Sequence, residues 1–328
     1  MPAVTSGTEQ VEPGAASARS WPPVHAWTPV TPVTAVPHSR PFPAVVGGPG
    51  PRLAVARSAL VILTAIACAV AVQAAVVGGI QHRSAQVRSL ATFRNALAKG
   101  EAPIGDADAH GHLLAMGTPM ALLEIPSASV HEVVLQGTTS GVLMSGPGHR
   151  RGTPFPGQAG TSVALGRRAA YGGPFRRLSG VKVGANIRVT TGQGVSTYRV
   201  TSVRRAGDPA PLPLAEGTGR LQLVTATGPP FVPDGVVRVD ADLTSHAFPP
   251  TPVGHGALPS AERPLANDKE TTWALVLWLQ LLIAVSVGAV WAWARWGRAQ
   301  SWVVFAPPIV LASLAATGQF FRLLPNLL

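Results

Sequence analysis

The sequence predicts a mainly β domain that lies between membrane-spanning helices. Three apolar runs are each about as long as the roughly 20 residues that cross a bilayer as a helix. Between the first and second runs, short stretches of β-branched and apolar residues alternate with polar ones, and Gly or Pro interrupts them about every ten residues. Several short strands at this spacing favour a barrel or a sandwich.

Residues 1–57 are predicted to be a disordered cytoplasmic tail. They are rich in Pro, Ala, Val, Ser and Gly, as in "WPPVHAWTPVTPVTAVPHSRPFPAVVGGPGPR". Each proline fixes φ and removes a backbone donor, so neither a helix nor a strand ladder can continue through the segment. Because the segment begins too polar and continues too long, it does not fit a signal peptide.

Residues 58–80, "SALVILTAIACAVAVQAAVVGGI", are predicted to be the first transmembrane helix and to remain as an anchor. The following residues 81–120 are predicted to form a stalk and linker. Within them, Leu90, Phe93 and Leu97 recur at the spacing of one helical face. This pattern indicates a short helix at the membrane surface.

Residues 248–272 are predicted to be a second linker, followed by transmembrane helices at 273–294 and 301–321. Tryptophans near the ends of these runs are typical of the membrane interface. The loop between the two helices carries Arg295 and Arg298, which places it in the cytoplasm under the positive-inside rule. The predicted localisation is therefore a multi-pass cell-membrane protein with a cytoplasmic N-terminal tail and an extracytoplasmic β domain.

The composition argues against several kinds of site. The chain has 26 Lys and Arg against 15 Asp and Glu, but the arginines are scattered and no nucleic-acid-binding motif accompanies them. We therefore expect membrane lipid, and no nucleic acid, as a partner. Cys68 is the only cysteine and lies in the first apolar run, so we predict no disulfide framework and no metal site. No cofactor is predicted either.

Residues 121–247 are predicted to form the β domain. In one of its strands, Ile187 and Val189 alternate with Arg188 and Thr190. The segments "GPGHRRGTPFPGQAG", "YGGPFRRL" and "LQLVTATG" follow one another in this region. In their order and spacing they resemble the sortase family, the membrane-anchored cysteine transpeptidases of bacterial cell surfaces. The resemblance implies a closed eight-stranded β-barrel flanked by transmembrane helices.

The resemblance also implies where catalytic groups belong. Sortases use a cysteine thiolate as nucleophile, a histidine that moves protons and an arginine that stabilises the oxyanion or positions the substrate. Matched by position, the histidine falls on Arg167, the cysteine on Ala226 and the arginine on or near Val236. A methyl group cannot be acylated, and a guanidinium stays protonated and cannot act as a general base. The sequence therefore predicts that the chemistry is lost.

Three residues are candidate substitutes if the chemistry has instead moved. His149, in "GPGH", is the best candidate base, although a histidine there also fits a hydrogen-bonding role in a loop. Thr225 offers a hydroxyl beside Ala226, but a hydroxyl needs a nearby base to become a nucleophile. Arg238 lies two residues beyond Val236 and would take the arginine role if the strand register slips.

The leading hypothesis is a catalytically inactive, sortase-like membrane protein of the bacterial cell surface that acts as a peptide or protein binding module. Its expected partners are a sorting-signal peptide of the Leu-Pro-x-Thr-Gly type, a cell-surface protein or a true sortase. One alternative is an active sortase-type transpeptidase or hydrolase with relocated catalytic residues. Another is a membrane scaffold in which the helices, and not the β domain, contact partners.

Overall fold

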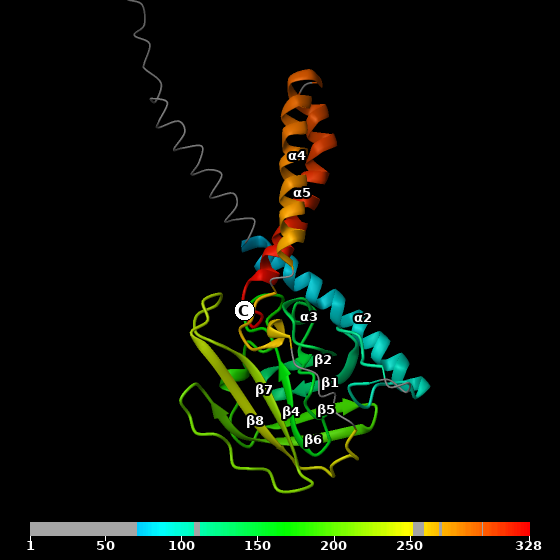
Figure 1. Ribbon diagram of the computed structural model, residues 1–328, viewed down its shortest axis with the longest axis vertical. Coiled ribbons are helices and arrows are strands. Elements are labelled where there is room, and N and C mark those ends of the chain that lie inside the picture. The colour runs from blue at the N-terminus through cyan, green and yellow to red at the C-terminus, as the bar shows by residue number, and fades with distance from the viewer. Residues whose placement is uncertain (1–70, 108–111, 252–258, 269–270, 297) are drawn as a thin grey trace, which may run out of the picture. The chain divides into compact units, whose positions relative to one another are not determined.

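Some of the predicted segments fall outside the part of the chain that the structure describes. The computed structural model describes residues 71–107, 112–251, 259–268, 271–296 and 298–328 (Figure 1). All of them belong to one unit, Val55–Leu328. The predicted tail at 1–57 and most of the first predicted transmembrane helix lie outside these residues.

The β domain is a closed eight-stranded barrel, which confirms the fold prediction. Its strands follow one another around the barrel in the order β1-β2-β3-β4-β7-β8-β6-β5. Neighbouring strands are antiparallel except for the parallel pairs β2–β3 and β4–β7. The strands are β1 (Pro119–Ile125), β2 (Val130–Gln136), β3 (Gly148–His149), β4 (Gly160–Leu165), β5 (Asn186–Thr191), β6 (Gly194–Arg204), β7 (Gly219–Thr227) and β8 (Gly235–Leu243).

The alternation read from the sequence places the barrel core. In β5, Ile187 and Val189 are buried, whereas Arg188 is exposed. Both buried residues belong to one cluster of apolar side chains inside the barrel, to which every long strand contributes. Burying one aliphatic side chain contributes roughly 1.5–3 kcal/mol, so this interior is the main source of stability for the domain.

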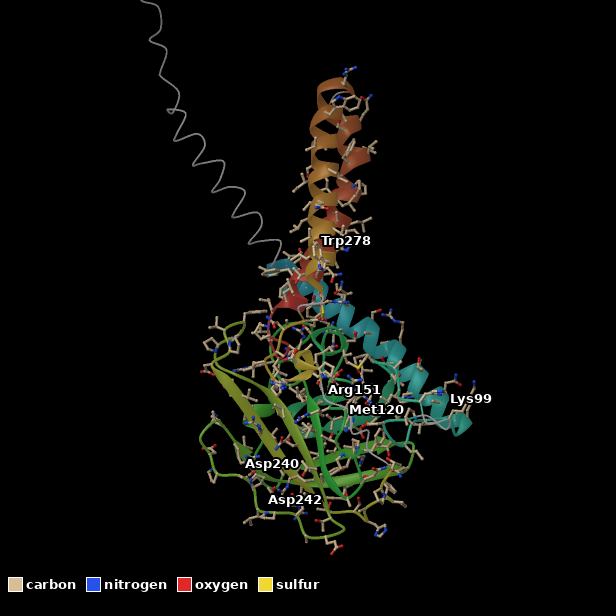
Figure 2. The ribbon with its side chains drawn as sticks, in the orientation of Figure 1. Lys99, Met120, Arg151, Asp240, Asp242 and Trp278 are labelled. Carbon is tan, nitrogen blue, oxygen red and sulfur yellow. The ribbon has the colours of Figure 1, made fainter. Side chains whose placement is uncertain are left out.

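A second set of contacts on the barrel is charged. The carboxylate of Asp240, on β8, accepts hydrogen bonds from Arg204 (2.5 and 3.1 Å), Gln222 (2.8 Å) and Ser202 (2.9 Å). Asp242 lies two residues further along the strand (Figure 2). It pairs with Arg220 at 2.6 Å. Burial opposes ionisation of Asp240, but these donors hold its pKa below the ordinary value for a carboxyl group.

Helix α2 (Gly78–Lys99) packs against β1 and β2 (Figure 1). Phe93 is 1% exposed and lies in a cluster with Val133, Leu135 and Val142, and Leu90 and Leu97 pack beside it. The apolar face predicted for this segment is therefore the face that contacts the barrel. The Gln86 side chain reinforces this contact, because it accepts a hydrogen bond from Val133 N at 2.7 Å and donates one to Ser145 O at 2.9 Å.

Helices α4 (Thr272–Trp296) and α5 (Arg298–Leu323) form a hairpin in which the two helices contact each other along their length. Within them, Thr272–Ala289 and Val303–Leu323 are long and apolar enough to cross a membrane. Their outer faces carry exposed apolar side chains such as Ile283 (63% exposed) and Leu311 (67% exposed). Apolar surface of this kind suits a lipid environment rather than water, which agrees with the two predicted C-terminal spans.

Candidate functional site

Three adjacent strands, β4, β7 and β8, bring together the positions that the family resemblance assigns to catalysis. In the parallel pair β4–β7, Leu165 lies opposite Val224, and the next residue continues the ladder because Gly166 N donates to Val224 O at 3.0 Å. Arg167 therefore follows at the level of Ala226. In the antiparallel pair β7–β8, Ala226 lies directly opposite Val236. The structure thus places Arg167, Ala226 and Val236 side by side.

Ala226 lies on the outer face of the sheet in an apolar surface. Its neighbours there are Val163, Leu165 and Val224, with Val236 partly buried beside them. The adjacent residues Ala164 and Leu223 belong to the barrel interior instead, as the alternation of side chains along a strand requires. The position matched to the nucleophile is therefore a methyl group in a hydrocarbon surface.

Arg167 is completely buried, and its contacts are structural. Its Nη2 donates to the Ser140 hydroxyl at 2.7 Å and to the Ser140 carbonyl oxygen at 3.1 Å, and its guanidinium lies 5.3 Å from the centre of the Tyr171 ring. Burial lowers the pKa of Arg167 to about 10, opposed by the interaction with Tyr171. At neutral pH the group therefore remains protonated, and it has no lone pair with which to accept a proton.

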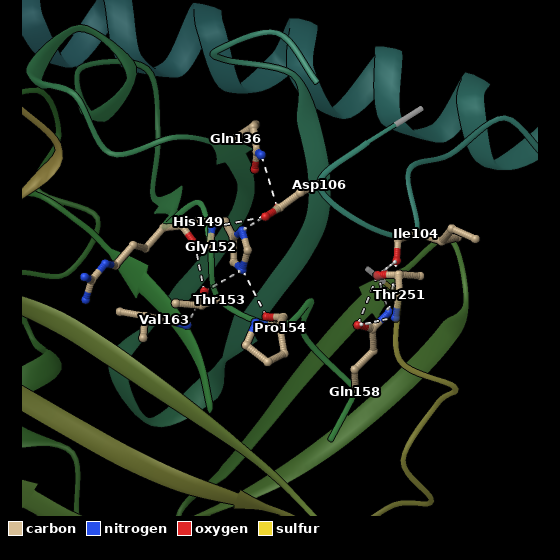
Figure 3. Close-up of polar contacts among 11 residues, drawn as sticks. Ile104, Asp106, Gln136, His149, Gly152, Thr153, Pro154, Gln158, Val163 and Thr251 are labelled. Atoms are coloured by element: carbon tan, nitrogen blue, oxygen red, sulfur yellow. Dashed lines mark hydrogen bonds and ion pairs between the residues drawn. The ribbon is translucent and has the colours of Figure 1, made fainter. Parts of the chain in front are cut away.

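His149 sits in a buried polar network (Figure 3). Its Nε2 lies 3.2 Å from both Pro154 O and Thr153 Oγ1, and its Nδ1 lies 3.7 Å from Asp106 Oδ1. Burial lowers its pKa in spite of the opposing effect of Asp106 and of the hydrogen bond to Pro154. The ring is thus engaged in holding the 149–154 loop.

Asp106 links this network to the rest of the barrel. It accepts a hydrogen bond from Gln136 Nε2 at 3.2 Å and another from Gly152 N at 3.1 Å. Figure 3 shows His149 directed toward Asp106, Thr153 and Pro154. These contacts fit the loop-stabilising role that the sequence analysis weighed against a catalytic one.

The two other candidate substitutes are not joined to His149. Thr225 is buried, its hydroxyl donates to Gly166 O at 2.8 Å, and its side chain points to the opposite face of β7 from Ala226. Arg238 lies opposite Val224, and the β7–β8 register runs without a slip from Arg220 to Thr227. The register shift that would move Arg238 beside Ala226 is therefore absent from this pair of strands.

The segment after α5 covers Ala226, and no sequence motif predicted this contact. Leu327 is completely buried in the same apolar cluster as Ala226, together with Leu143. The backbone after β4 holds this segment, because Arg168 N donates to Leu327 O at 3.0 Å and Ala170 N donates to Leu328 O at 3.3 Å. In the sequence, Pro325 indicates that the helix ends nearby, since proline cannot continue a helix, but it does not indicate where the following residues pack.

Asn326 holds the same segment in place through hydrogen bonds to residues outside the apolar cluster. It is completely buried, and its Nδ2 donates to Thr138 O and to Arg263 O, each at 3.0 Å. Its backbone N donates to Ala266 O at 2.8 Å. Part of the predicted 248–272 linker therefore packs on the barrel, where Glu262 also forms an ion pair with Arg151.

Comparison with protein families gives a match for the barrel. A family model described as "Sortase domain" matches residues 123–238, which contain Arg167, Ala226 and Val236. No curated protein matches the chain.

Several solved structures are similar to this chain. A sortase D5 transpeptidase from Clostridium perfringens is 22% identical over 49% of this chain and 99% of its own, with a TM-score of 0.41. Sortase C-1 from Actinomyces oris is 25% identical over 48% of this chain and 98% of its own, with a TM-score of 0.36. Sortase C from Clostridium perfringens, solved with the C-terminal cell wall sorting motif, is 17% identical over 49% of this chain and 89% of its own, with a TM-score of 0.37.

Proposed function

We propose that residues 123–238, which match a family model described as "Sortase domain", bind peptide or protein segments without carrying out acyl transfer. The observation that carries the proposal is the identity of the three residues whose positions lie side by side on the neighbouring strands. Ala226 and Val236 supply no thiolate and no side-chain hydrogen-bond donor, and Arg167, which stays protonated, supplies no proton acceptor. Cys68, the only cysteine of the sequence, falls in the first predicted transmembrane helix.

The surface around Ala226 supports binding of an extended segment with an apolar side chain. Val163, Leu165 and Val224 provide a hydrocarbon floor. The N–H groups of Arg168 and Ala170, at the edge of this floor, donate to the carbonyl oxygens of residues 327 and 328, and they would donate to a bound peptide once that segment is displaced. Backbone hydrogen bonds combined with a side-chain pocket are the usual physical basis of peptide recognition at a sheet.

The proposed partner is a sorting-signal peptide of the Leu-Pro-x-Thr-Gly type, a cell-surface protein that carries one, or a partner sortase. Two candidate membrane-spanning helices, within α4 and α5, support attachment to the cell membrane. We propose that the chain is multi-pass, with the barrel outside the cell and the N-terminal tail in the cytoplasm. The support for this topology is the positive charge of Arg295 and Arg298, which under the positive-inside rule favours a cytoplasmic position for the loop between the two helices.

The test is a fluorescence-anisotropy titration of a labelled Leu-Pro-x-Thr-Gly peptide, with a scrambled peptide as control. It uses the full chain in detergent and a variant lacking residues 324–328, because those residues cover Ala226. We expect saturable binding by the variant and recovery of intact peptide. Cleavage that disappears in His149→Ala or Thr225→Val would establish the relocated enzyme instead, and no binding by either protein would favour the scaffold.

A further inference from the structure

We propose that residues 324–328 are an internal ligand of the sortase domain and keep its binding surface closed until they are displaced. The inference rests on the proposed binding function, because it states how that function is regulated. In the fold, the apolar surface around Ala226, where the resemblance places the catalytic cysteine, is covered by residues of the same chain.

The occupant makes the contacts that a bound peptide would make. Leu327 inserts its side chain into the apolar cluster that contains Ala226 and is completely removed from solvent. The carbonyl oxygens of Leu327 and Leu328 accept hydrogen bonds from Arg168 N and Ala170 N. The internal segment therefore occupies the floor and the backbone donors that a peptide from outside would need.

The sequence of the occupant also resembles the proposed ligand. Residues 324–327 read Leu-Pro-Asn-Leu, so a Leu-Pro pair is followed by one residue and then by the residue that packs against Ala226. In a Leu-Pro-x-Thr-Gly peptide the threonine holds this fourth place. Leu327 substitutes for the threonine with a side chain that suits a methyl-lined floor.

The end of α5 is fixed close to the site, and this raises the effective concentration of the segment. Phe321 meets the Tyr171 ring edge-on with 5.8 Å between ring centres, and its carbonyl oxygen accepts a hydrogen bond from the Ser140 hydroxyl at 3.4 Å. Ser140 is also the residue that Arg167 holds. A tethered ligand competes intramolecularly, so a free peptide binds with an apparent affinity reduced by the fraction of molecules that are open.

A segment with a purely structural role would stay packed on Ala226, whereas the proposed internal ligand covers Ala226 reversibly. A small recess lined by Thr227, Phe231 and Leu328 borders Ala226. Because α5 contains a candidate membrane span that ends at Leu323, a shift of the hairpin relative to the barrel would withdraw the segment that follows. The hairpin is thus the element through which a membrane partner would open the site.

The experiment measures the accessibility of position 226 in the full chain, without any peptide. Ala226→Cys is introduced with Cys68→Ser, and the rate of maleimide labelling in detergent is followed by mass spectrometry. Val232→Cys in the same background is the control, because Val232 is 65% exposed. We expect labelling at position 226 to be at least tenfold slower than at position 232, and Leu327→Asp to accelerate it at least tenfold, whereas Leu327→Met leaves it slow.

Equal labelling rates at positions 226 and 232 in the otherwise unchanged chain would overturn the inference, as would a rate that Leu327→Asp does not alter. Circular dichroism verifies that each variant retains the barrel. If Leu327→Asp does not fold, deletion of residues 324–328 provides the same comparison. Since no peptide is present, failure of this test is distinct from failure of the peptide titration, which concerns the binding function itself.

Discussion

Truncating Leu327 tests the link between side-chain packing and closure quantitatively. Leu327 is completely buried, and replacing a buried leucine by alanine costs about 2–5 kcal/mol. The barrel interior is a separate apolar cluster to which Leu327 does not contribute. In Leu327→Ala we therefore expect the loss to appear as local opening of residues 324–328 and not as unfolding of the barrel.

Amide hydrogen exchange provides the assay, because Arg168 N and Ala170 N are protected by the carbonyl groups of this segment. A loss of about 2 kcal/mol raises the open population about 30-fold, since about 1.4 kcal/mol corresponds to a factor of ten. Exchange at residues 168–170 should accelerate at least by that factor, while exchange in the β5–β6 hairpin stays unchanged. Unchanged exchange at residues 168–170, or equal acceleration in both regions, would refute the reasoning.

Three further predictions follow from the fold. Phe93→Ala should lower the free energy of unfolding by about 3–5 kcal/mol in denaturant titrations because it empties the α2–barrel contact, whereas Val87→Ala at an exposed position should stay within about 0.5 kcal/mol. Because the pKa of Asp240 is lowered in the folded state, its ionisation stabilises the fold above the unfolded-state pKa of about 3.9, and this stabilisation is lost as the pH falls through the lower folded-state pKa. Arg204→Met should therefore weaken the dependence of the melting temperature on pH in the acid range. An unaltered dependence of melting temperature on pH would contradict the assignment. Ala226→Cys alone should not restore peptide cleavage detectable by mass spectrometry, because the adjacent Arg167 still cannot accept a proton.

The barrel was predictable from two kinds of sequence pattern, namely the alternation of apolar and polar residues within strands and the order of motifs along the chain. Alternation in segments such as Ile187–Val189 marks the buried face of a strand, and the motif around His149 fixes the family resemblance. The convergence of Arg167 and Ala226 follows from the parallel pairing of β4 with β7, which the alternation within either strand does not indicate. A strand as short as β3, Gly148–His149, leaves no periodic signal at all.

The cover over Ala226 was not predictable, because it depends on contacts between residues far apart in the sequence. Asn326 bonds to Thr138 across 188 positions, and nothing in either residue's local sequence indicates the other. The apolar face of α2 was predicted to lie at the membrane surface but packs on the barrel, because Phe93 and its neighbours suit a lipid surface and a protein surface equally well. Tertiary packing decided both, and hydropathy cannot distinguish a lipid partner from a protein one.

The most direct test of the account is the fate of the peptide after it binds. The variant lacking residues 324–328 is saturated with Leu-Pro-x-Thr-Gly peptide, incubated with an amine nucleophile, and analysed by mass spectrometry for peptide and protein together. We expect the peptide to be recovered intact and the protein mass to be unchanged. A shortened peptide, an amine-linked product or a protein–peptide adduct would contradict it, because each requires the acyl transfer that Ala226 and Arg167 cannot perform.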